Sequence, residues 1–399
     1  MRKLKNSGID WIGEIPVDWT LQRGKTIFAQ RLTKGNPSEI LLAATQRYGM
    51  IPQSEVEGVV QIKEDTDIQQ FRTVHKKDFV ISLRSFQGGF EYSQYEGVCS
   101  PAYQVFYNTT PICHNYYRFL FKSEGFIQKM NSMTVGIREG KNIQYSDFAN
   151  SLIPIPPIEQ QCRIADYLDR KCSQIDSIIA KQQEVIEKLK EYKLSVITEA
   201  VTKGLNPDVP MKDSGVDWIG EIPEGWSCTR LKYVLTIKSG DPVFGEIQEE
   251  FGRFPIYGGG EKIGYCSDFN TSESSILIGR VGARCGCITM PTGLAWATDN
   301  ALIIDTEIQR EYIYYILVAC NLNRLNSSNA QPLITATKIK ETIIPLSHSI
   351  EEQYKIVGYL SKKCASIEDS IKGKQLLVDK LINYKKSLIY EIVTGKREV

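Results

Sequence analysis

Two long segments of the chain carry apolar residues at spacings that alternate between three and four, the pattern of a helix face that packs against another helix. In the first segment these positions are Ile164, Leu168, Cys172, Ile175, Ile179, Ile186, Leu189 and Val196. In the second they are Ile356, Leu360, Cys364, Ile367, Ile371, Val378, Leu381 and Leu388. Proline is missing from Gln161 to Leu205 and from Gln353 onward, so each segment can form a helix of about 40 residues, roughly 60 Å long.

Proline and glycine mark the ends of both predicted helices. Pro154, Pro156 and Pro157 prevent the first helix from starting earlier, and Pro345 does the same for the second. Glycine is the usual residue just past a helix end, and Gly204 and Gly395 occupy that place. A helix with one apolar stripe is poorly stable alone in water, so we expect the two stripes to bury each other. An antiparallel pairing would place the segments between them at opposite ends of a rod.

The chain is also an internal repeat. "SGIDWIGEIPVDW" (residues 7–19) returns as "SGVDWIGEIPEGW" (residues 214–226). "IEQQCRIADYLDRKCSQIDSII" (from Ile158) returns as "IEEQYKIVGYLSKKCASIEDSI" (from Ile350). The thirteen-residue sequence, here called the box, has apolar residues such as Trp11, Ile12 and Trp19, and we interpret it as a structural clasp between a variable block and the end of a long helix. The 205–214 stretch reads as a proline-containing linker.

The two blocks between the repeats, roughly 20–150 and 227–342, show no obvious likeness to each other. Both hold short β-type runs, such as "DFVISL" and "SSILIG", separated by turns. We therefore predict an α+β fold with two globular α/β domains, a pair of long antiparallel coiled-coil helices and a pseudo-twofold internal repeat. The predicted boundaries are 1–152 for the first box and domain, 153–205 for the central helix, 206–342 for the linker, second box and second domain, and 343–399 for the last helix.

Several loops of the variable blocks combine basic or amide side chains with glycine or serine. Arg can form two hydrogen bonds to guanine, Gln can pair with adenine, and glycine lets a backbone approach phosphate. The candidate DNA-binding residues are Arg84, Ser85, Gln87, Gly88, Arg138, Lys141, Arg280, Arg284 and Gln331. The alternative is that these loops are ordinary surface turns with solvated charges.

Composition removes several other classes of function. The formal net charge is +1, so any surface for a polyanion must be local. The chain has three histidines and its ten cysteines are scattered apart from Cys285 and Cys287, so we expect no metal and no cofactor, and mostly buried, reduced thiols. No apolar run reaches the ~18 residues of a membrane helix, and the N-terminal residues lack the pattern of a signal peptide, so we expect a cytoplasmic protein without membrane contact.

Taken together, these sequences resemble the specificity subunit of type I restriction–modification enzymes over essentially the whole chain. The resemblance is carried by the two boxes, by "IPIPPIEQQCRIADYLD" with its copy "EEQYKIVGYL", and by "SFQGGFEYSQYEGVCSPAY" in the first block. The second block contributes "YGGGEKIGYCSD", "ILIGRVGARCG" and "WATDNALII". No single motif is decisive, but their combination is highly specific.

The resemblance implies that each variable block is a target recognition domain for one half of a bipartite site in double-stranded DNA. The paired helices would act as a spacer and would dock two methyltransferase subunits, and motor-nuclease subunits would join for restriction. The candidates for partner binding are Gln161, Tyr167, Gln353 and Tyr359. The subunit itself would be no enzyme, and it would direct adenine methylation or restriction by its partners.

Two alternatives belong to other classes of function. One is a coiled-coil scaffold whose two end domains bind proteins. The other is a methyltransferase or nuclease fragment, which the sequence disfavours because it has neither an Asn/Asp-Pro-Pro-aromatic loop nor a GxxxxGK[ST] phosphate-binding loop.

Overall fold

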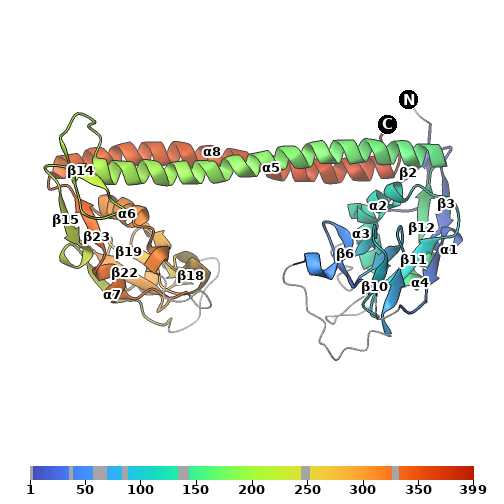
Figure 1. Ribbon diagram of the computed structural model, residues 1–399, viewed down its shortest axis with the longest axis horizontal. Coiled ribbons are helices and arrows are strands. Elements are labelled where there is room, and N and C mark those ends of the chain that lie inside the picture. Colours follow the sequence, from blue (N-terminus) through green and yellow to red (C-terminus); the bar gives the residue numbers. More distant parts are fainter. Residues whose placement is uncertain are drawn as a thin grey trace. The chain divides into compact units, whose positions relative to one another are not determined.

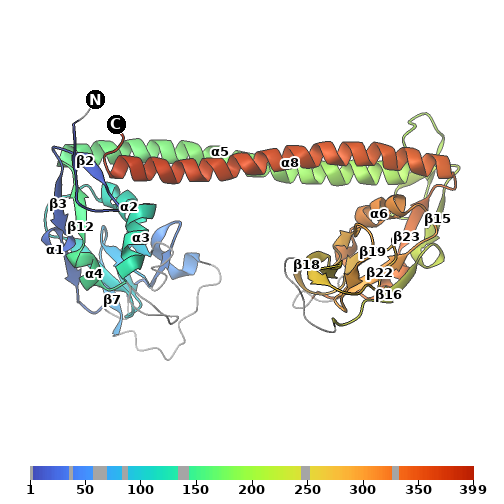
Figure 2. The same cartoon turned by 180° about the vertical axis from the view of Figure 1, so that it is seen from behind.

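The structure, a computed structural model, describes residues 3–35, 39–56, 70–82, 89–133, 143–243, 252–325 and 332–399. The chain divides into two compact units (Figures 1 and 2). Unit 1 comprises residues 1–182 and 376–399, and unit 2 comprises residues 183–375. Each long helix contributes residues to both units. The sequence-based boundaries treat each long helix as a separate segment and stay a prediction.

The two long helices are α5 (Ile158–Lys203) and α8 (Ile350–Val393). Both begin after the prolines that were expected to delay them. Both are followed by a glycine with a left-handed backbone conformation, with φ of 74° at Gly204 and 76° at Gly395. The predicted positions and ends of the two helices are confirmed.

All sixteen apolar positions predicted to form the helix seam are buried or half-buried. In unit 1 the N-terminal half of α5 packs against the C-terminal part of α8, and in unit 2 the C-terminal part of α5 packs against the start of α8. Ion pairs flank the seam, with Asp176–Lys385 at 2.6 Å in unit 1 and Lys193–Glu368 at 2.5 Å in unit 2. The helix pairing is therefore antiparallel, as predicted.

Each box forms the turn and second strand of a short antiparallel hairpin. In unit 1, β1 (Leu4–Asn6) pairs with β2 (Glu14–Pro16), and in unit 2, β13 (Met211–Asp213) pairs with β14 (Glu221–Pro223). The two glycines that the boxes have in common, Gly8 and Gly13 in the first and Gly215 and Gly220 in the second, have φ near +70°, a conformation that side chains disfavour. This backbone requirement explains why glycine recurs at the same two places of the repeat.

The box of unit 1 packs where α8 ends and α5 begins. A Cβ atom at Gly395 would lie 2.4 Å from Cδ of Pro16 and 3.1 Å from the ring of Trp19. The indole N–H of Trp19 donates a 2.8 Å hydrogen bond to Oε1 of Gln160. The hydroxyl of Tyr390 donates to the carbonyl oxygen of Trp11 at 2.6 Å.

The box of unit 2 makes the equivalent junction where α5 ends and α8 begins. Gly204 lies against Trp226, and the indole N–H of Trp226 donates a 2.9 Å hydrogen bond to Oε2 of Glu352. Two junctions of the same kind thus need two copies of the same short sequence. The interpretation of the box as a clasp between a variable block and a helix end is confirmed.

The remaining elements of unit 1 follow in chain order. They are β3 (Thr20–Arg23), α1 (Gly24–Ile27), β4 (Phe28–Arg31), β5 (Leu42–Thr45), β6 (Gly49–Pro52), η1 (Gln53–Glu55), β7 (Arg72–Val74), β8 (Phe79–Ile81), β9 (Phe90–Tyr92), β10 (Gly97–Cys99), β11 (Gln104–Asn108), α2 (His114–Lys122), α3 (Glu124–Met133), α4 (Tyr145–Asn150) and β12 (Leu152–Ile155).

Unit 2 adds a second series. Its elements are β15 (Ser227–Arg230), η4 (Leu231–Tyr233), β16 (Thr236–Ser239), β17 (Phe254–Gly258), β18 (Glu261–Cys266), β19 (Ile276–Gly279), η5 (Gly282–Arg284), β20 (Ile288–Thr289), β21 (Trp296–Ala297), β22 (Ala301–Asp305), α6 (Arg310–Ala319), η6 (Leu322–Leu325), α7 (Ala336–Lys340) and β23 (Ile343–Leu346).

The two variable blocks share the order of their main sheet although their sequences look unrelated, while the remaining strands form the pairs β5-β6 and β10-β7 in unit 1 and the sheet β18-β17-β21 in unit 2. The four-stranded sheet has the order β4-β11-β8-β9 in unit 1 and β16-β22-β19-β20 in unit 2. These orders are the same in chain sequence: first strand, last strand, then the two strands between them. The strand that follows each box also pairs with the strand that precedes each long helix, β3 with β12 and β15 with β23.

Different side chains fill the two cores, which hides this likeness in the sequence. The core of unit 1 is a cluster of aromatic rings that includes Phe28, Phe79, Phe106, Phe121 and Phe148. The core of unit 2 is mostly aliphatic, with residues such as Ile276, Ile278, Leu302, Ile304 and Ile316. Cores accept varied apolar side chains when the total volume and the pattern are kept.

We expect Gly395→Ala to destabilise the chain by about 2 kcal/mol, because it places a side chain at positive φ and against Pro16. Gly373→Ala, in the exposed interior of α8 with no atom near its Cβ position, should instead stabilise by about 0.5–1 kcal/mol. Urea denaturation of both variants measures their free energies of unfolding. Equal midpoints for the two variants would contradict the clasp role of Gly395.

Candidate DNA interface

The structure describes two of the predicted DNA-binding residues, Arg280 and Arg284. Both lie in the connection between β19 and β20, where Arg280 follows the last residue of β19 and Arg284 ends η5. The other predicted residues lie outside the described residues: Arg84, Ser85, Gln87, Gly88, Arg138, Lys141 and Gln331.

The predicted residues nevertheless fall on equivalent connections of the two units. In chain order, Arg84 to Gly88 lie between β8 and β9, which correspond to β19 and β20. Arg138 and Lys141 lie between α3 and α4, and Gln331 lies between η6 and α7, the helix that precedes β23 as α4 precedes β12. The sequence thus selected the same two connections twice.

In unit 2 these two connections are joined by backbone hydrogen bonds. The N–H of Gly282 donates to the carbonyl of Pro332 at 3.1 Å, and the N–H of Ile334 donates to the carbonyl of Arg280 at 2.9 Å. Pro332 directly follows Gln331 in the chain. The segment after Gln331 is therefore held beside the loop that carries both arginines.

In unit 1 the corresponding connections adjoin the same end of the sheet. Gln104, at the start of β11, pairs in register with Ile81, the last residue of β8. Its side-chain amide donates to the carbonyl of Ile143 at 3.3 Å, just after the α3–α4 connection. Beyond β8, the N–H of Ser82 donates to the carbonyl of Gly89 at 2.8 Å. In both units, therefore, described residues that flank the two candidate loops lie near one end of the sheet.

Arg280 is half-buried and partly engaged. Its Nη1 donates to Oγ of Ser239 at 3.3 Å, and its Nε is buried with no hydrogen-bond partner among the residues that the structure describes. In unit 1 the strand position equivalent to Ser239 holds Arg31. That arginine donates to both carboxylate oxygens of Asp78, at 2.7 and 3.0 Å, and stacks on Tyr107.

Arg284 is more exposed and forms an ion pair with an acidic residue from the neighbouring hairpin. Its Nη2 lies 2.7 Å from Oε2 of Glu261, and the two side chains are 51% and 56% exposed. Glu261 is the first residue of β18, and β18 pairs with β17 across a two-residue turn at Gly259 and Gly260. The φ angles of this turn are 57° and 101°.

The glycines of the candidate interface serve internal packing. A Cβ atom at Gly279 would lie 2.3 Å from the carbonyl oxygens of both Arg284 and Gly259. A Cβ atom at Gly286 would lie 2.5 Å from Oδ1 of Asn323. The β17–β18 turn and the β19–β20 loop are therefore packed backbone to backbone, and this contact, rather than an approach to phosphate alone, accounts for glycine at Gly279.

The hairpin formed by β17 and β18 was not selected as a site from the sequence. Besides Glu261 it carries Lys262, whose ammonium donates to the hydroxyl of Tyr265 at 3.0 Å and lies 4.6 Å from the centre of its ring. The same hydrogen bond raises the pKa of Lys262 above its usual value. The signal in the sequence was the Gly-Gly pair between two β-type runs in "PIYGGGEKIGY", which is typical of a tight hairpin.

Two of the four residues predicted to bind partners are used inside the fold. Gln161 is buried, and its amide accepts from the N–H of Cys113 at 3.0 Å and donates to the carbonyl of Pro156 at 2.9 Å. Gln353 is also buried and donates to the carbonyl of Ser347 at 2.8 Å. Tyr167 is half-buried and Tyr359 is 44% exposed, so these two are the more accessible of the four.

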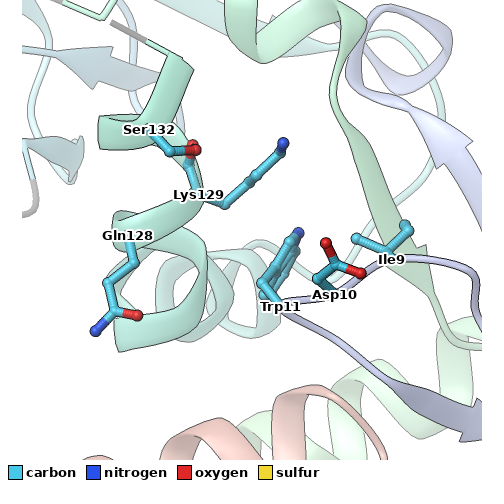
Figure 3. Close-up of a pocket in the computed structure, with 6 residues that line it drawn as sticks. All are labelled: Ile9, Asp10, Trp11, Gln128, Lys129 and Ser132. Atoms are coloured by element: carbon cyan, nitrogen blue, oxygen red, sulfur yellow. The ribbon is translucent and has the colours of Figure 1, made fainter.

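Two cavities accompany the boxes. In unit 1 a cavity of about 350 Å³ is lined by Ile9, Asp10 and Trp11 from the box and by Gln128, Lys129 and Ser132 from α3 (Figure 3). In unit 2 a cavity of about 570 Å³ lies between the end of α5, the linker, β14 and Tyr359. Neither cavity includes a predicted DNA-binding residue.

The thiol of Cys285 makes its hydrogen bond within the β19–β20 loop. It is buried, which raises its pKa, and it donates to the carbonyl of Arg280 at 3.3 Å. All ten cysteines are unpaired thiols. Within the described residues no group of three or more His, Cys, Asp or Glu side chains is arranged to hold a metal ion, and no helix is long and apolar enough to cross a membrane.

Comparison with known proteins assigns the chain to a family. The model of the type I restriction modification DNA specificity domain matches residues 16–188 and again residues 223–376. The chain belongs to this family. The two matches cover both units, as the internal repeat requires, and the resemblance inferred from the sequence is confirmed.

Curated relatives are specificity subunits. The chain is 27% identical over 312 residues to the type I restriction enzyme MjaVIII specificity subunit of Methanocaldococcus jannaschii, a match that covers 65% of this chain and 66% of that subunit. It is 25% identical over 426 residues to the putative type I restriction enzyme MjaX specificity subunit of the same organism, and this match covers 97% of this chain and 96% of that subunit. Specificity subunits are non-catalytic, so the family confirms the prediction that the chain is no enzyme.

Solved structures show the same fold. A chain from a structure of a type I restriction–modification system superposes with a TM-score of 0.72 at 16% identity, over 96% of this chain and 99% of that chain. The HsdS subunit from Thermoanaerobacter tengcongensis superposes with a TM-score of 0.50, also at 16% identity, over 96% and 98%. The predicted α+β fold class is confirmed.

We expect Gly279→Ala to cost about 1–3 kcal/mol, because its methyl group would overlap the carbonyls of Gly259 and Arg284. Gly282→Asn should stay within about 1 kcal/mol of the original chain, because Asn tolerates positive φ and no atom lies near that Cβ position. Urea denaturation gives the free energies, and hydrogen exchange of residues 258–261 reports whether the two loops separate. A neutral Gly279→Ala variant would argue against the backbone contact.

Proposed function

We propose that the chain is the DNA-reading specificity subunit of a type I restriction–modification complex, and that it binds a bipartite target in double-stranded DNA. The proposal is supported by where Arg84, Arg138, Arg280, Arg284 and Gln331 occur in the chain order of strands and helices; of these candidates the structure describes Arg280 and Arg284. All five fall on the same two connections of two units that share the order of their main sheet. Each unit would present those connections to one half of the target.

The unlike loops on a like frame favour two different half-sites. Base pairs are distinguished by the donors and acceptors that side chains offer to the major groove, so different loop residues read different bases. In each unit the sheet, the helices and the box pack around a hydrophobic core of their own. A change in the loops of one unit would therefore leave the fold and the loops of the other unit unaffected.

Exposed apolar residues on the helix pairs favour docking of partner subunits. Unit 1 exposes Ile158 and Tyr384, and unit 2 exposes their repeat mates Ile350 and Tyr192, each at 45–68%. The same two repeat positions are thus exposed in both units, so the two units would offer equivalent apolar contacts to two copies of a partner. Tyr167 in unit 1 and Tyr359 in unit 2 also occupy equivalent positions of the repeat and would contact the partners in the same way. Gln161 and Gln353 would act by holding the helix starts in place.

The partners in this proposal are two methyltransferase subunits and, for cleavage, motor-nuclease subunits. The complex would methylate adenine in the target or restrict unmethylated DNA, and it would act in the cytoplasm, where the DNA lies. A coiled-coil scaffold that binds only proteins would use the same exposed helix residues. Binding of the assembled complex to DNA with and without its methylation motif separates the two functions.

We expect that replacing residues 20–150 with the corresponding block of another family member changes one half of the methylated motif. The other half should be retained, because the loops of unit 2 are untouched. The measurement is methylation-motif sequencing of cells that carry the variant and the cognate methyltransferase. A swap that altered both halves would refute independent reading by the two units.

We also expect two methyltransferase subunits per chain, because each unit pairs a box with the start of one long helix and the end of the other. Native mass spectrometry of the complex measures the ratio. Tyr384→Ala should weaken one of the two binding events, and Tyr192→Ala should weaken the other, since these residues are repeat mates in different units. Saturation at one methyltransferase would rule out equivalent docking sites.

A further inference from the structure

Glu261 places a negative charge inside an interface that is proposed to face DNA. Its carboxylate lies 2.7 Å from Nη2 of Arg284, and both side chains are about half exposed. A carboxylate beside phosphates is repelled by them, and it also cancels the attraction that Arg284 would add. Sequence-independent binding to DNA would therefore be stronger without Glu261.

Stability does not account for the pair. Ion pairs at this degree of exposure contribute little to folding, because water screens them and both side chains lose freedom. The backbone of both residues is already fixed by other contacts. The Gly259–Gly260 turn is held by a 2.7 Å hydrogen bond from Oγ1 of Thr289 to the carbonyl of Gly260, and the loop of Arg284 packs on Gly279.

Because the backbones of Glu261 and Arg284 are already fixed, the contact between their side chains mainly determines the direction in which the guanidinium of Arg284 points. The contact with Glu261 engages the Nη2 end of that group. Among the described residues, Nε and Nη1 of Arg284 make no hydrogen bond, so both can still donate. Nη2 carries a second hydrogen, which together with Nη1 forms the edge that can donate to the O6 and N7 acceptors of one guanine.

We propose that Glu261 is a positioning residue for Arg284, which it orients toward one base pair while it suppresses the attraction of this arginine for phosphates. This inference rests on the proposed function of unit 2 as the reader of one half-site. Glu261 would thus raise discrimination between DNA sequences and lower affinity for DNA in general.

The test uses the full chain assembled with its cognate methyltransferase subunits and the variant Glu261→Gln. Methylation-motif sequencing should show one base pair of the half-site read by unit 2 relaxed by about tenfold, with the other half-site unchanged. Binding to a duplex without the motif should become tighter at low salt. The slope of log K against log salt should steepen by about one unit, because one more cation is available for phosphate.

Glu341→Gln is the matched control. Glu341 has a similar exposure of 50% and pairs with Arg230 and Lys232 on the β15–β23 side of the unit, so its removal changes the charge of the chain equally. It should alter neither the motif nor discrimination between bases. Equal changes in both variants would mean that net charge alone is responsible and would overturn the inference.

The double variant distinguishes positioning from direct reading. If Glu261 acts through Arg284, adding Glu261→Gln to Arg284→Ala has no further effect on the motif. A further effect would mean that Glu261 reads a base itself, for example the amino group of cytosine, and the positioning role would be wrong. An unchanged motif and salt slope in Glu261→Gln would also overturn it, whereas an original complex without any split methylated motif would overturn the proposed function itself.

Discussion

The burial of one apolar stripe by another, along α5 and α8, is the constraint on which the fold depends. Neither helix can bury its stripe by itself, and a long helix with an uncovered apolar face is unstable in water. Because the pairing is antiparallel, the end of each helix meets the start of the other. The boxes pack at these two junctions, so their hairpins, tryptophans and glycines follow from the geometry of the helix pair.

The repeat fixes the frame of each unit and leaves its core and loops free to vary. The strand orders are the same, yet phenylalanine rings fill one core and isoleucine and leucine side chains fill the other. Loop side chains that point to solvent carry fewer packing requirements than the core, so they can change faster than the frame. The proposed function, in which two like units read two unlike sequences, would need this separation.

The sequence alone predicted the helices, their antiparallel pairing, their ends and the role of the box, because each depends on local pattern and on residues with special backbone behaviour such as Gly204 and Gly395. It did not predict the shared order of the main sheets, since equivalent core positions hold different apolar residues. It assigned Gln161 and Gln353 to partner binding, a role that stays a prediction, whereas the structure adds a buried amide that holds each helix start. Glu261 escaped notice because its partner is 23 residues away on another loop.

The near-neutral charge of the chain acquires a physical meaning from these contacts. Arg31 is paired with Asp78, which precedes β8, and Arg284 is paired with Glu261, so an arginine near the four-stranded sheet of each unit is offset by a carboxylate. Affinity for phosphates grows with unpaired positive charge and is independent of sequence, whereas discrimination grows with the number of donors held in fixed directions. A subunit that specifies a site within a larger complex gains from donors held in fixed directions. It loses from unpaired positive charge, because excess affinity for any DNA would retain the complex at wrong sites. The net charge of +1 is therefore compatible with a reader that leaves much of the binding energy to its partners.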